Sequence, residues 1–310
     1  MKAFITGLTG FVGQYLADFL QKNKIKVYGT SYPEKPPPNK KNIFHIDIRK
    51  EKKLSQFIKE IKPEFVFHLA AISNVHVSWE KRKITMETNV IGTFNLLEAV
   101  RKFSPQSKIL LVGSSDIYGY SIEKKRLLKE NLDTNPINPY GVSKNCQEII
   151  GKFYSSIENI WIIITRSFNH TGPGQNPSFV CSDWAKQIAE IEKGKREPIV
   201  KVGNLESIRD FSDVRDIVRA YFLLLLKGKK GEIYNVCSGK AYSLRKILDI
   251  LISYSKISIK VEIDTKKLRK TDFPFLVGDN SKLISHTGWQ PQIQIEKTLL
   301  DLLNYWRQKV

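Results

Sequence analysis

Short apolar segments alternate with amphipathic segments through the first half of the chain. Segments such as residues 64–69 are mostly apolar, which is typical of strands buried on both faces of a sheet. Between them, apolar residues recur at the spacing of one helix face. The pattern predicts strands at residues 2–6, 26–30, 42–46, 64–69, 108–113 and 160–165, and helices at residues 10–21, 54–61, 84–103 and 140–156. Because strand and helix alternate, right-handed crossovers should build an α/β fold around a doubly wound parallel sheet.

This alternation loosens after about residue 172, where short strands and longer loops separate the apolar helices. The helices predicted there lie near residues 182–193, 214–226, 244–254 and 299–308. A chain of 310 residues suits one large lobe and one small lobe. We therefore expect residues 1–171 to form the parallel-sheet domain and residues 172–310 a smaller α/β C-terminal lobe intertwined with it.

A glycine-rich loop follows the first predicted strand and opens the first helix. Gly7 permits a tight turn, Gly10 lets a ligand approach the backbone, and Gly13 allows close packing of helix on sheet. With Phe11 and Val12, the loop places N–H donors at a helix N-terminus, where a pyrophosphate binds favourably. In this strand–loop–helix context, the sequence predicts a Rossmann-type dinucleotide site.

The next strand indicates which dinucleotide binds. An NAD(H) site usually has a carboxylate where this strand ends. Here the first carboxylate after the strand is that of Glu34, beyond a proline. NADP(H) is therefore favoured and NAD(H) remains possible, with Ser31, Tyr32 and Lys35 available for a 2′-phosphate, although the arginine often found there is missing. Asp47 and Ile48 follow the third strand and either hold the adenine or, for Asp47, cap a helix.

Tyr140 and Lys144 are the main candidates for acid–base chemistry. Four residues along a helix bring both side chains to one face. A lysine ammonium near a phenol stabilises the phenolate, so we expect Lys144 to lower the pKa of Tyr140 toward neutrality. Such a pair suits proton transfer to or from a carbonyl or alcohol oxygen, which makes the cofactor a nicotinamide dinucleotide used for redox chemistry.

The net charge of +19 modifies this picture little. Lysine supplies 38 of the 50 basic residues and is scattered along the chain, which favours a solvated surface over a nucleic-acid partner. No apolar run is long enough to span a membrane, and the first residues leave no room for a signal peptide. The three widely spaced cysteines support neither a metal site nor a disulfide framework, so we expect a cytoplasmic protein.

Taken together, these motifs resemble those of the extended short-chain dehydrogenase/reductases that modify nucleotide sugars. The resemblance covers essentially the whole length of the chain. The resemblance rests on the glycine loop, residues 67–71, 89–93 and 113–119, and the pair Tyr140 and Lys144. It implies that Leu69, Ala70 and Ala71 line the cofactor groove. It further implies that Asn89 lies near the active site, and that Lys144 binds the nicotinamide ribose.

The same resemblance assigns roles around residue 114. Ser114 matches the catalytic serine or threonine, whose hydroxyl polarises the substrate carbonyl, and the neighbouring Ser115 is an alternative for this role. Asp116 stands where the sugar 4,6-dehydratases carry a glutamate base. An aspartate is one methylene shorter and reaches less far.

The second half of the chain resembles the GDP-4-dehydro-6-deoxy-D-mannose reductases (GDP-6-deoxy-D-lyxo-4-hexulose reductases). The matching strings are residues 166–175, 179–180, 207–216 and 234–239, the second of which includes Val180. The resemblance implies that Asn169, Arg209 and Arg269 contact the nucleotide and its pyrophosphate, for which arginine forks are well shaped. Lys186 either assists them or is a surface lysine.

We therefore expect NAD(P)H-dependent reduction of the C4 keto group of a GDP-linked 4-keto-6-deoxy sugar, giving GDP-D-rhamnose or a related sugar. The alternatives are a GDP-mannose 4,6-dehydratase, a nucleotide-sugar 4-epimerase, a 4-reductase for another stereoisomer or a 6-deoxyheptose, and a cofactor-sensing binding protein. The resemblance also implies a homodimer formed by the helices predicted at residues 84–103 and 140–156.

Overall fold

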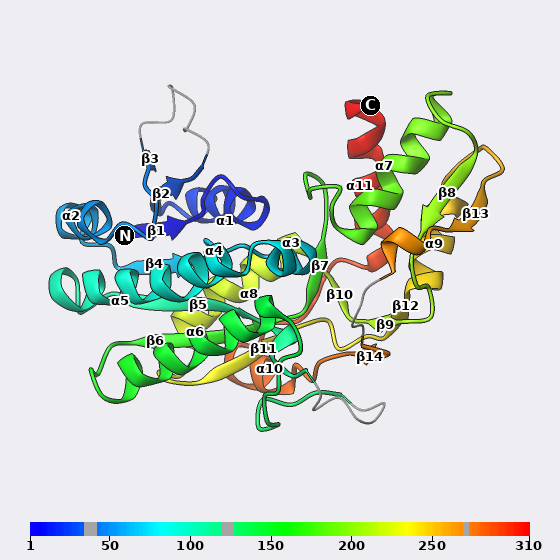
Figure 1. Cartoon of the computed structure of the whole chain (residues 1–310). Coiled ribbons are helices and arrows are strands. Elements are labelled where there is room, and N and C mark those ends of the chain that lie inside the picture. The colour runs from blue at the N-terminus through cyan, green and yellow to red at the C-terminus, as the bar shows by residue number, and fades with distance from the viewer. Residues whose placement is uncertain (34–41, 120–126, 269–272) are drawn as a thin grey trace.

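A seven-stranded parallel sheet forms the centre of the protein (Figure 1). The computed structural model describes residues 1–33, 42–119, 127–268 and 273–310. The strands lie in the order β11-β6-β5-β4-β1-β2-β3, and every neighbouring pair is parallel. Their bounds are β1 Lys2–Thr6, β2 Lys26–Ser31, β3 Ile43–His45, β4 Phe65–His68, β5 Lys108–Ser114, β6 Ile162–Ser167 and β11 Ile233–Val236. The predicted doubly wound sheet is confirmed.

Helices cover both faces of this sheet, as the alternation of strand and helix predicts. On one face lie α1 (Phe11–Lys22) and α8 (Val214–Lys227), with α10 (Ser281–Thr287) beside α8. On the other face lie α2 (Glu51–Ile61), α5 (Gly92–Phe103) and α6 (Pro139–Ser156). Each helix turns its apolar face toward the strands, so the sheet is hydrophobic on both sides.

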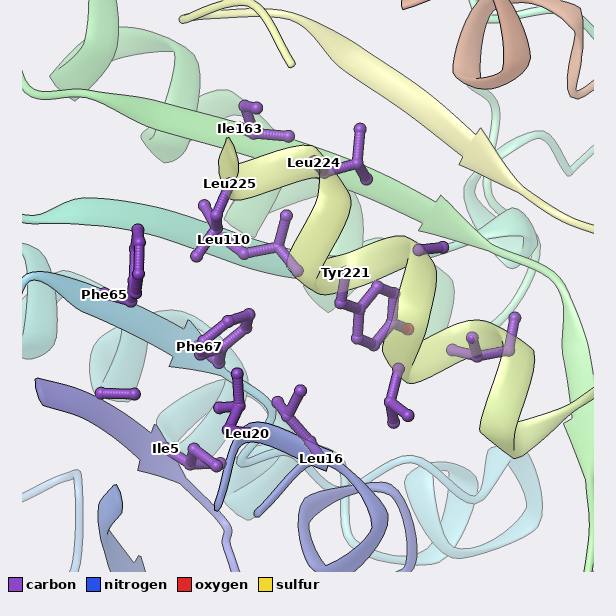
Figure 2. Packing of buried hydrophobic residues seen from close by; sticks show 14 of the residues in the cluster. Ile5, Leu16, Leu20, Phe65, Phe67, Leu110, Ile163, Tyr221, Leu224 and Leu225 are labelled. Carbon is purple, nitrogen blue, oxygen red and sulfur yellow. The ribbon is translucent and has the colours of Figure 1, made fainter. Parts of the chain in front are cut away.

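Successive residues of one strand serve opposite faces, because side chains alternate along a strand. Leu110 of β5 packs under α8 with Tyr221 and Leu224, as Figure 2 shows. Its neighbours Ile109 and Leu111 face α5 and α6 instead. Burying each apolar side chain of this size stabilises the folded state by about 1.5–3 kcal/mol.

The long helix predicted for residues 84–103 is interrupted, which corrects the prediction. Residues 84–103 hold the end of α4 (Arg82–Met86), one π-helical turn η1 (Glu87–Ile91) and then α5, and a separate helix α3 (Val75–Glu80) precedes them. The buried Asn89 lies in the π turn, where its side chain bonds to groups outside the helix, and its carbonyl accepts a hydrogen bond from the Thr93 hydroxyl. Tertiary hydrogen bonds of this kind stabilise a turn that helix periodicity does not reveal.

The second lobe has its own core and lies beside the sheet's carboxyl edge (Figure 1). Its helices are α7 (Val180–Glu192), α9 (Leu244–Ser253) and α11 (Ile295–Lys309). Short strands complete it and join it to the sheet domain: β7 Asn169–Thr171, β8 Ile199–Val202, β9 Ile208–Arg209, β10 Phe211–Asp213, β12 Tyr242–Ser243, β13 Lys260–Ile263 and β14 Phe275–Leu276. Part of the segment expected in this lobe, namely α8, β11 and α10, instead packs with the large sheet.

Candidate active site

The glycine loop joins β1 to α1 at the carboxyl edge of the sheet, where ligands of doubly wound folds bind. Gly7 has a φ of +70°, and a Cβ there would lie 3.0 Å from the Cα of Ala70. A Cβ on Gly13 would lie 2.4 Å from the carbonyl oxygen of Gly7. Both positions therefore require glycine, for the conformation at Gly7 and for helix packing at Gly13.

The first turn of α1 is suited to an anion. Phe11 begins the helix, no side chain caps it at Gly10, and its first turn contains no acidic residue. Its N–H donors and the positive end of its dipole are those that a pyrophosphate requires. The loop therefore fits the dinucleotide that the sequence predicts.

The predicted substrate loop lies against the same helix. The ring of Phe11 stacks on that of His170 with the ring centroids 6.4 Å apart, and the Tyr15 hydroxyl donates to the carbonyl of Pro173 over 2.8 Å. Two segments 158 residues apart in the chain thus lie side by side at the start of α1.

An arginine does lie where β2 ends, which corrects the sequence-based expectation that none is present. The Arg49 guanidinium donates to the Tyr32 hydroxyl over 3.1 Å and lies 5.5 Å from the centre of its ring. Three hydrogen bonds to the Asp47 carboxylate hold the guanidinium in place. In the sequence, Arg49 is visible only as a basic residue two positions after Asp47. Because it lies 17 residues after Tyr32, the sequence did not reveal their contact.

The helix-cap alternative for Asp47 is wrong, because α2 begins after Lys50. Asp47 instead accepts from the main-chain N–H and the guanidinium of Arg49. Burial alone would raise the pKa of Asp47, but these bonds lower it below its usual value. Ile48 is buried under Gly92 of α5. Ser31 ends β2 as a buried residue in register with His45.

The end of β4 lines the other side of the glycine loop. The main-chain N–H of Ala70 donates to the Thr6 hydroxyl over 3.1 Å, which places the segment containing Leu69 and Ala71 beside Gly7. The Asn89 amide accepts from the N–H of Ile72 over 2.8 Å. Asn89 also donates to the Ser143 hydroxyl over 2.9 Å, so it ties this loop to α6, the helix that carries Tyr140.

The catalytic candidates converge where β5 meets α6. Asn138 caps α6 by accepting from the N–H of Gly141 over 2.7 Å, and Pro139 follows it, which places Tyr140 in the first helical turn. The Tyr140 phenol shares a hydrogen bond with the hydroxyl of Ser114, the last residue of β5. Ser114, of the two serine candidates, therefore contacts the tyrosine.

Asp116 lies on the same side of the site. Its carboxylate accepts from the Asn138 amide over 3.2 Å, and its main-chain N–H donates to the Ser114 hydroxyl over 3.2 Å. Its negative charge acts on Tyr140. Ser114, Asp116 and Tyr140 therefore lie together as one interacting group.

The predicted lowering of the Tyr140 pKa is wrong for this structure. Burial raises the pKa of Tyr140 above its usual value, the Asp116 carboxylate raises it further, and only the bond to Ser114 lowers it. Spacing along the helix did not reveal this result, because the burial and the carboxylate both come from the tertiary structure. The phenol is therefore protonated at neutral pH and can act as a proton donor.

Lys144 lies one turn further along α6 and is almost fully buried. Its ammonium donates to the Val112 carbonyl over 2.7 Å and to the amide oxygen of Gln147 over 2.8 Å. Burial lowers the pKa of Lys144 to about 7. The sequence analysis missed Gln147, for which the only signal was a spacing of three residues in a helix.

The predicted substrate residues occupy several elements. Asn169 begins β7, and Val180 begins α7 and packs against the core of the second lobe. The Lys186 ammonium pairs with Glu190 at 3.4 Å and lies over the Trp306 ring, so it has the surroundings of a surface lysine. Its substrate role stays a prediction.

Arg209 is buried at the junction of the lobes, whereas Arg269 lies outside the described residues. The Arg209 guanidinium donates to the carbonyls of Ile208 and Phe273 over 2.8 and 2.6 Å. The neighbouring Asp210 accepts from the main chain and hydroxyl of Ser238. Burial raises the pKa of Asp210 to about 6.

Known proteins share this architecture over its full length. A sequence profile of the GDP-mannose 4,6 dehydratase family matches residues 4–302. The GDP-6-deoxy-D-mannose reductase of Pseudomonas aeruginosa is 32% identical over 309 residues, which cover 100% of this chain and 98% of the relative. The GDP-6-deoxy-D-talose 4-dehydrogenase of Aggregatibacter actinomycetemcomitans is 30% identical over 93% of this chain and 92% of its own length.

Solved structures agree with this assignment. The structure of RMD from Pseudomonas aeruginosa complexed with NADPH superposes with a TM-score of 0.89 at 31% identity, covering 100% of this chain and 99% of the other. A putative epimerase from Burkholderia cenocepacia superposes with a TM-score of 0.86 at 32% identity, covering 99% of this chain and 98% of the other. The chain therefore belongs to the GDP-mannose 4,6 dehydratase family, within the extended short-chain dehydrogenases/reductases.

Proposed function

We propose that this protein reduces the C4 keto group of a GDP-linked 4-keto-6-deoxy sugar with NADPH. The product is GDP-D-rhamnose or a related GDP-6-deoxy sugar. The observation that carries the proposal is the hydrogen bond between Ser114 and a protonated Tyr140 where β5 meets α6, in the sheet whose first strand leads into the glycine loop. The full-length similarity to a GDP-6-deoxy-D-mannose reductase supports the substrate class.

The residues suggest how the reaction proceeds. Bound NADPH would supply a hydride to the carbonyl carbon. Ser114 donates a hydrogen bond that polarises the carbonyl oxygen, and Tyr140 gives that oxygen a proton as the alcohol forms. The raised pKa of Tyr140 keeps this proton available at neutral pH. With the cofactor bound, Lys144 would hold the nicotinamide ribose, and its positive charge would stabilise the phenolate left on Tyr140.

NADPH is the favoured cofactor, with NADH as a possible substitute. A solved relative is complexed with NADPH. Within this chain, β2 ends without a carboxylate, and the Arg49 guanidinium lies beside Tyr32 at that position. An arginine there suits the 2′-phosphate that distinguishes NADPH from NADH.

A homodimer is the second part of the proposal. Ile91 and Phe94 on η1 and α5, and Ile149, Phe153 and Ile157 on and just after α6, are exposed although they are large and apolar. These two helices pack against each other, so the exposed side chains belong to one side of the sheet domain. Several exposed apolar side chains on one side of a domain are typical of protein interfaces.

We also assign the protein to the cytoplasm. Its three cysteines are free, and a reducing compartment suits unpaired thiols. No helix in the described ranges 1–33, 42–119, 127–268 and 273–310 is long and apolar enough to cross a membrane.

The decisive experiment supplies the protein with NADPH and with the 4-keto-6-deoxy intermediate prepared from GDP-mannose. It measures the rate of NADPH oxidation and then identifies the sugar product. We expect oxidation that depends on this intermediate, and a Tyr140→Phe variant with at most a few percent of the rate. A Tyr140→Phe variant that retained more activity would refute the proton-donor assignment. GDP-mannose alone should remain unchanged, whereas its dehydration would identify a GDP-mannose 4,6-dehydratase that uses Asp116 as base.

A further inference from the structure

The side chain of Gln147 makes a buried contact with Lys144 that the mechanism above does not use. Only 1% of Gln147 and 3% of Lys144 are exposed. The amide oxygen of Gln147 accepts from the Lys144 ammonium over 2.8 Å, and the Val112 carbonyl accepts from the same ammonium over 2.7 Å. Main chain supplies one acceptor in any sequence, whereas the other depends on residue 147.

The orientation of the Gln147 amide follows from the ammonium. An ammonium only donates hydrogen bonds, so the amide oxygen and not its NH₂ group must face Lys144. The NH₂ group is buried and has no hydrogen-bond partner within the described part of the chain. Burying an unsatisfied donor is costly, and an apolar side chain of similar size would avoid that cost. The side chain therefore serves Lys144 rather than the packing of α6.

Other ionisable groups near this end of α6 do not replace Gln147. His68 on β4 interacts with the charge of Lys144, and burial together with that charge lowers the pKa of His68 to about 3. Its ring nitrogens bond to the hydroxyls of Thr6 and Thr93 over 2.7 and 2.8 Å, which keeps it neutral and well oriented.

The remaining charges are engaged elsewhere. The charge of Asp116 raises the pKa of Tyr140, which lies one helical turn before Lys144 on α6. Glu148 on α6 and Arg166 on β6 form a buried ion pair with two hydrogen bonds, so their charges largely cancel. Among the residues that the structure describes, the acceptors that hold the ammonium are thus Val112 and Gln147.

We propose that Gln147 is a positioning residue for Lys144: its amide oxygen holds the buried ammonium in its charged form and in one orientation, one helical turn after Tyr140 on α6. The proposal rests on the reductase function for its effect on turnover. The contact itself does not depend on the substrate. Removing the oxygen should make Lys144 easier to deprotonate, and replacing it with a carboxylate should make Lys144 harder to deprotonate.

The direct test is an NMR titration of the protein with selectively 13C-labelled lysine, in the absence of substrate. The Lys144 signal is the one missing from a Lys144→Met variant. We expect Gln147→Leu to lower the midpoint of its titration by about one pH unit, because a buried charge loses an acceptor. We expect Gln147→Glu to raise the midpoint by about one to three units.

Gln187→Leu is the matched control. Gln187 is an equally buried glutamine on α7 in the second lobe, where it bonds to Asp183 and Lys201. Its replacement should leave the Lys144 midpoint unchanged. A midpoint that stays constant in Gln147→Leu, or that fails to rise in Gln147→Glu, would overturn the proposal. The glutamate variant decides the matter if the leucine variant does not fold.

Kinetics then separates this proposal from the proposed function. If Lys144 must be charged, Gln147→Leu should lower kcat/KM about tenfold at pH 8 and little at pH 5.5, following a one-unit fall in pKa. A shifted NMR midpoint in a protein that does not oxidise NADPH would refute the reductase function and leave the role of Gln147 intact. Equal loss at both pH values would refute the role of Gln147.

Discussion

The Ser114 hydroxyl has two partners, the Tyr140 phenol and the main-chain N–H of Asp116. This arrangement fixes the serine oxygen beside the proton donor, whereas Ser115 begins the short helix η2 (Ser115–Ile117). Both serines are buried, so burial alone did not distinguish them. The distinction comes from which side chain β5 directs toward α6.

Ser114→Ala should therefore lower kcat with the keto sugar about 100-fold, because one donor to the carbonyl oxygen is lost. Ser115→Ala should change it less than tenfold. Steady-state NADPH oxidation measures both values. If Ser115→Ala caused the larger loss, Ser115 would be the residue that polarises the carbonyl.

A second residue-scale prediction concerns Arg49. If its guanidinium contacts a 2′-phosphate, Arg49→Ala should raise the KM for NADPH about tenfold or more and leave the KM for NADH nearly unchanged. Arg196→Ala, which removes an arginine paired with Glu190 in the second lobe, is the control. Equal increases for both cofactors would assign Arg49 to folding of the loop and not to cofactor choice.

At the scale of elements, a buried ion pair joins α6 to β6. Arg166 donates twice to Glu148, over 3.0 and 2.8 Å, and also donates to the Glu130 carbonyl over 3.1 Å. The Arg166 guanidinium lies 4.8 Å from the centre of the Tyr118 ring, just after η2. These contacts of Arg166 fix the position of α6, and thereby of Tyr140, against the end of the sheet.

Glu148→Gln should lower the free energy of unfolding by about 3 kcal/mol at pH 7, because it leaves Arg166 buried without its counter-charge. Burial alone would raise the pKa of Glu148, but Arg166 lowers it below its usual value. The stabilisation is therefore present above the unfolded-state pKa and is lost as the pH falls through the folded-state pKa.

Urea denaturation of both proteins from pH 7 to pH 3 measures this difference, which should narrow toward the acid end. Glu190→Gln, in a half-exposed pair with Lys186, should cost less than about 1 kcal/mol. A constant difference between wild type and Glu148→Gln across the pH range would contradict the ion-pair account.

At the scale of the whole molecule, the exposed apolar residues of α5 and α6 determine the proposed assembly. Ile149→Asp combined with Phe153→Asp should convert a dimer into a monomer of 35.7 kDa, because each buried charge would disfavour the interface. Light scattering after gel filtration measures the mass. Ile263→Asp, on the exposed strand β13, should leave the dimer intact, and a dimeric double variant would exclude this surface as the interface.

Some of this protein follows from the sequence by itself. The pattern of residues along the chain predicts three features directly, because each depends on local spacing. They are the glycine loop, the succession of strands β1 to β6 along the chain, and the Tyr140–Lys144 pair. Family resemblance added the substrate class, through segments such as residues 166–175.

Only the tertiary structure decided the state of the site. The raised pKa of Tyr140, the contact of Arg49 with Tyr32 and the π turn around Asn89 all depend on burial or on partners distant in sequence. The bond from Lys144 to Gln147 spans three residues, yet its effect depends on the burial of both. Desolvation and long-range hydrogen bonds set these properties, and both arise only when β5, α6 and the glycine loop are packed together.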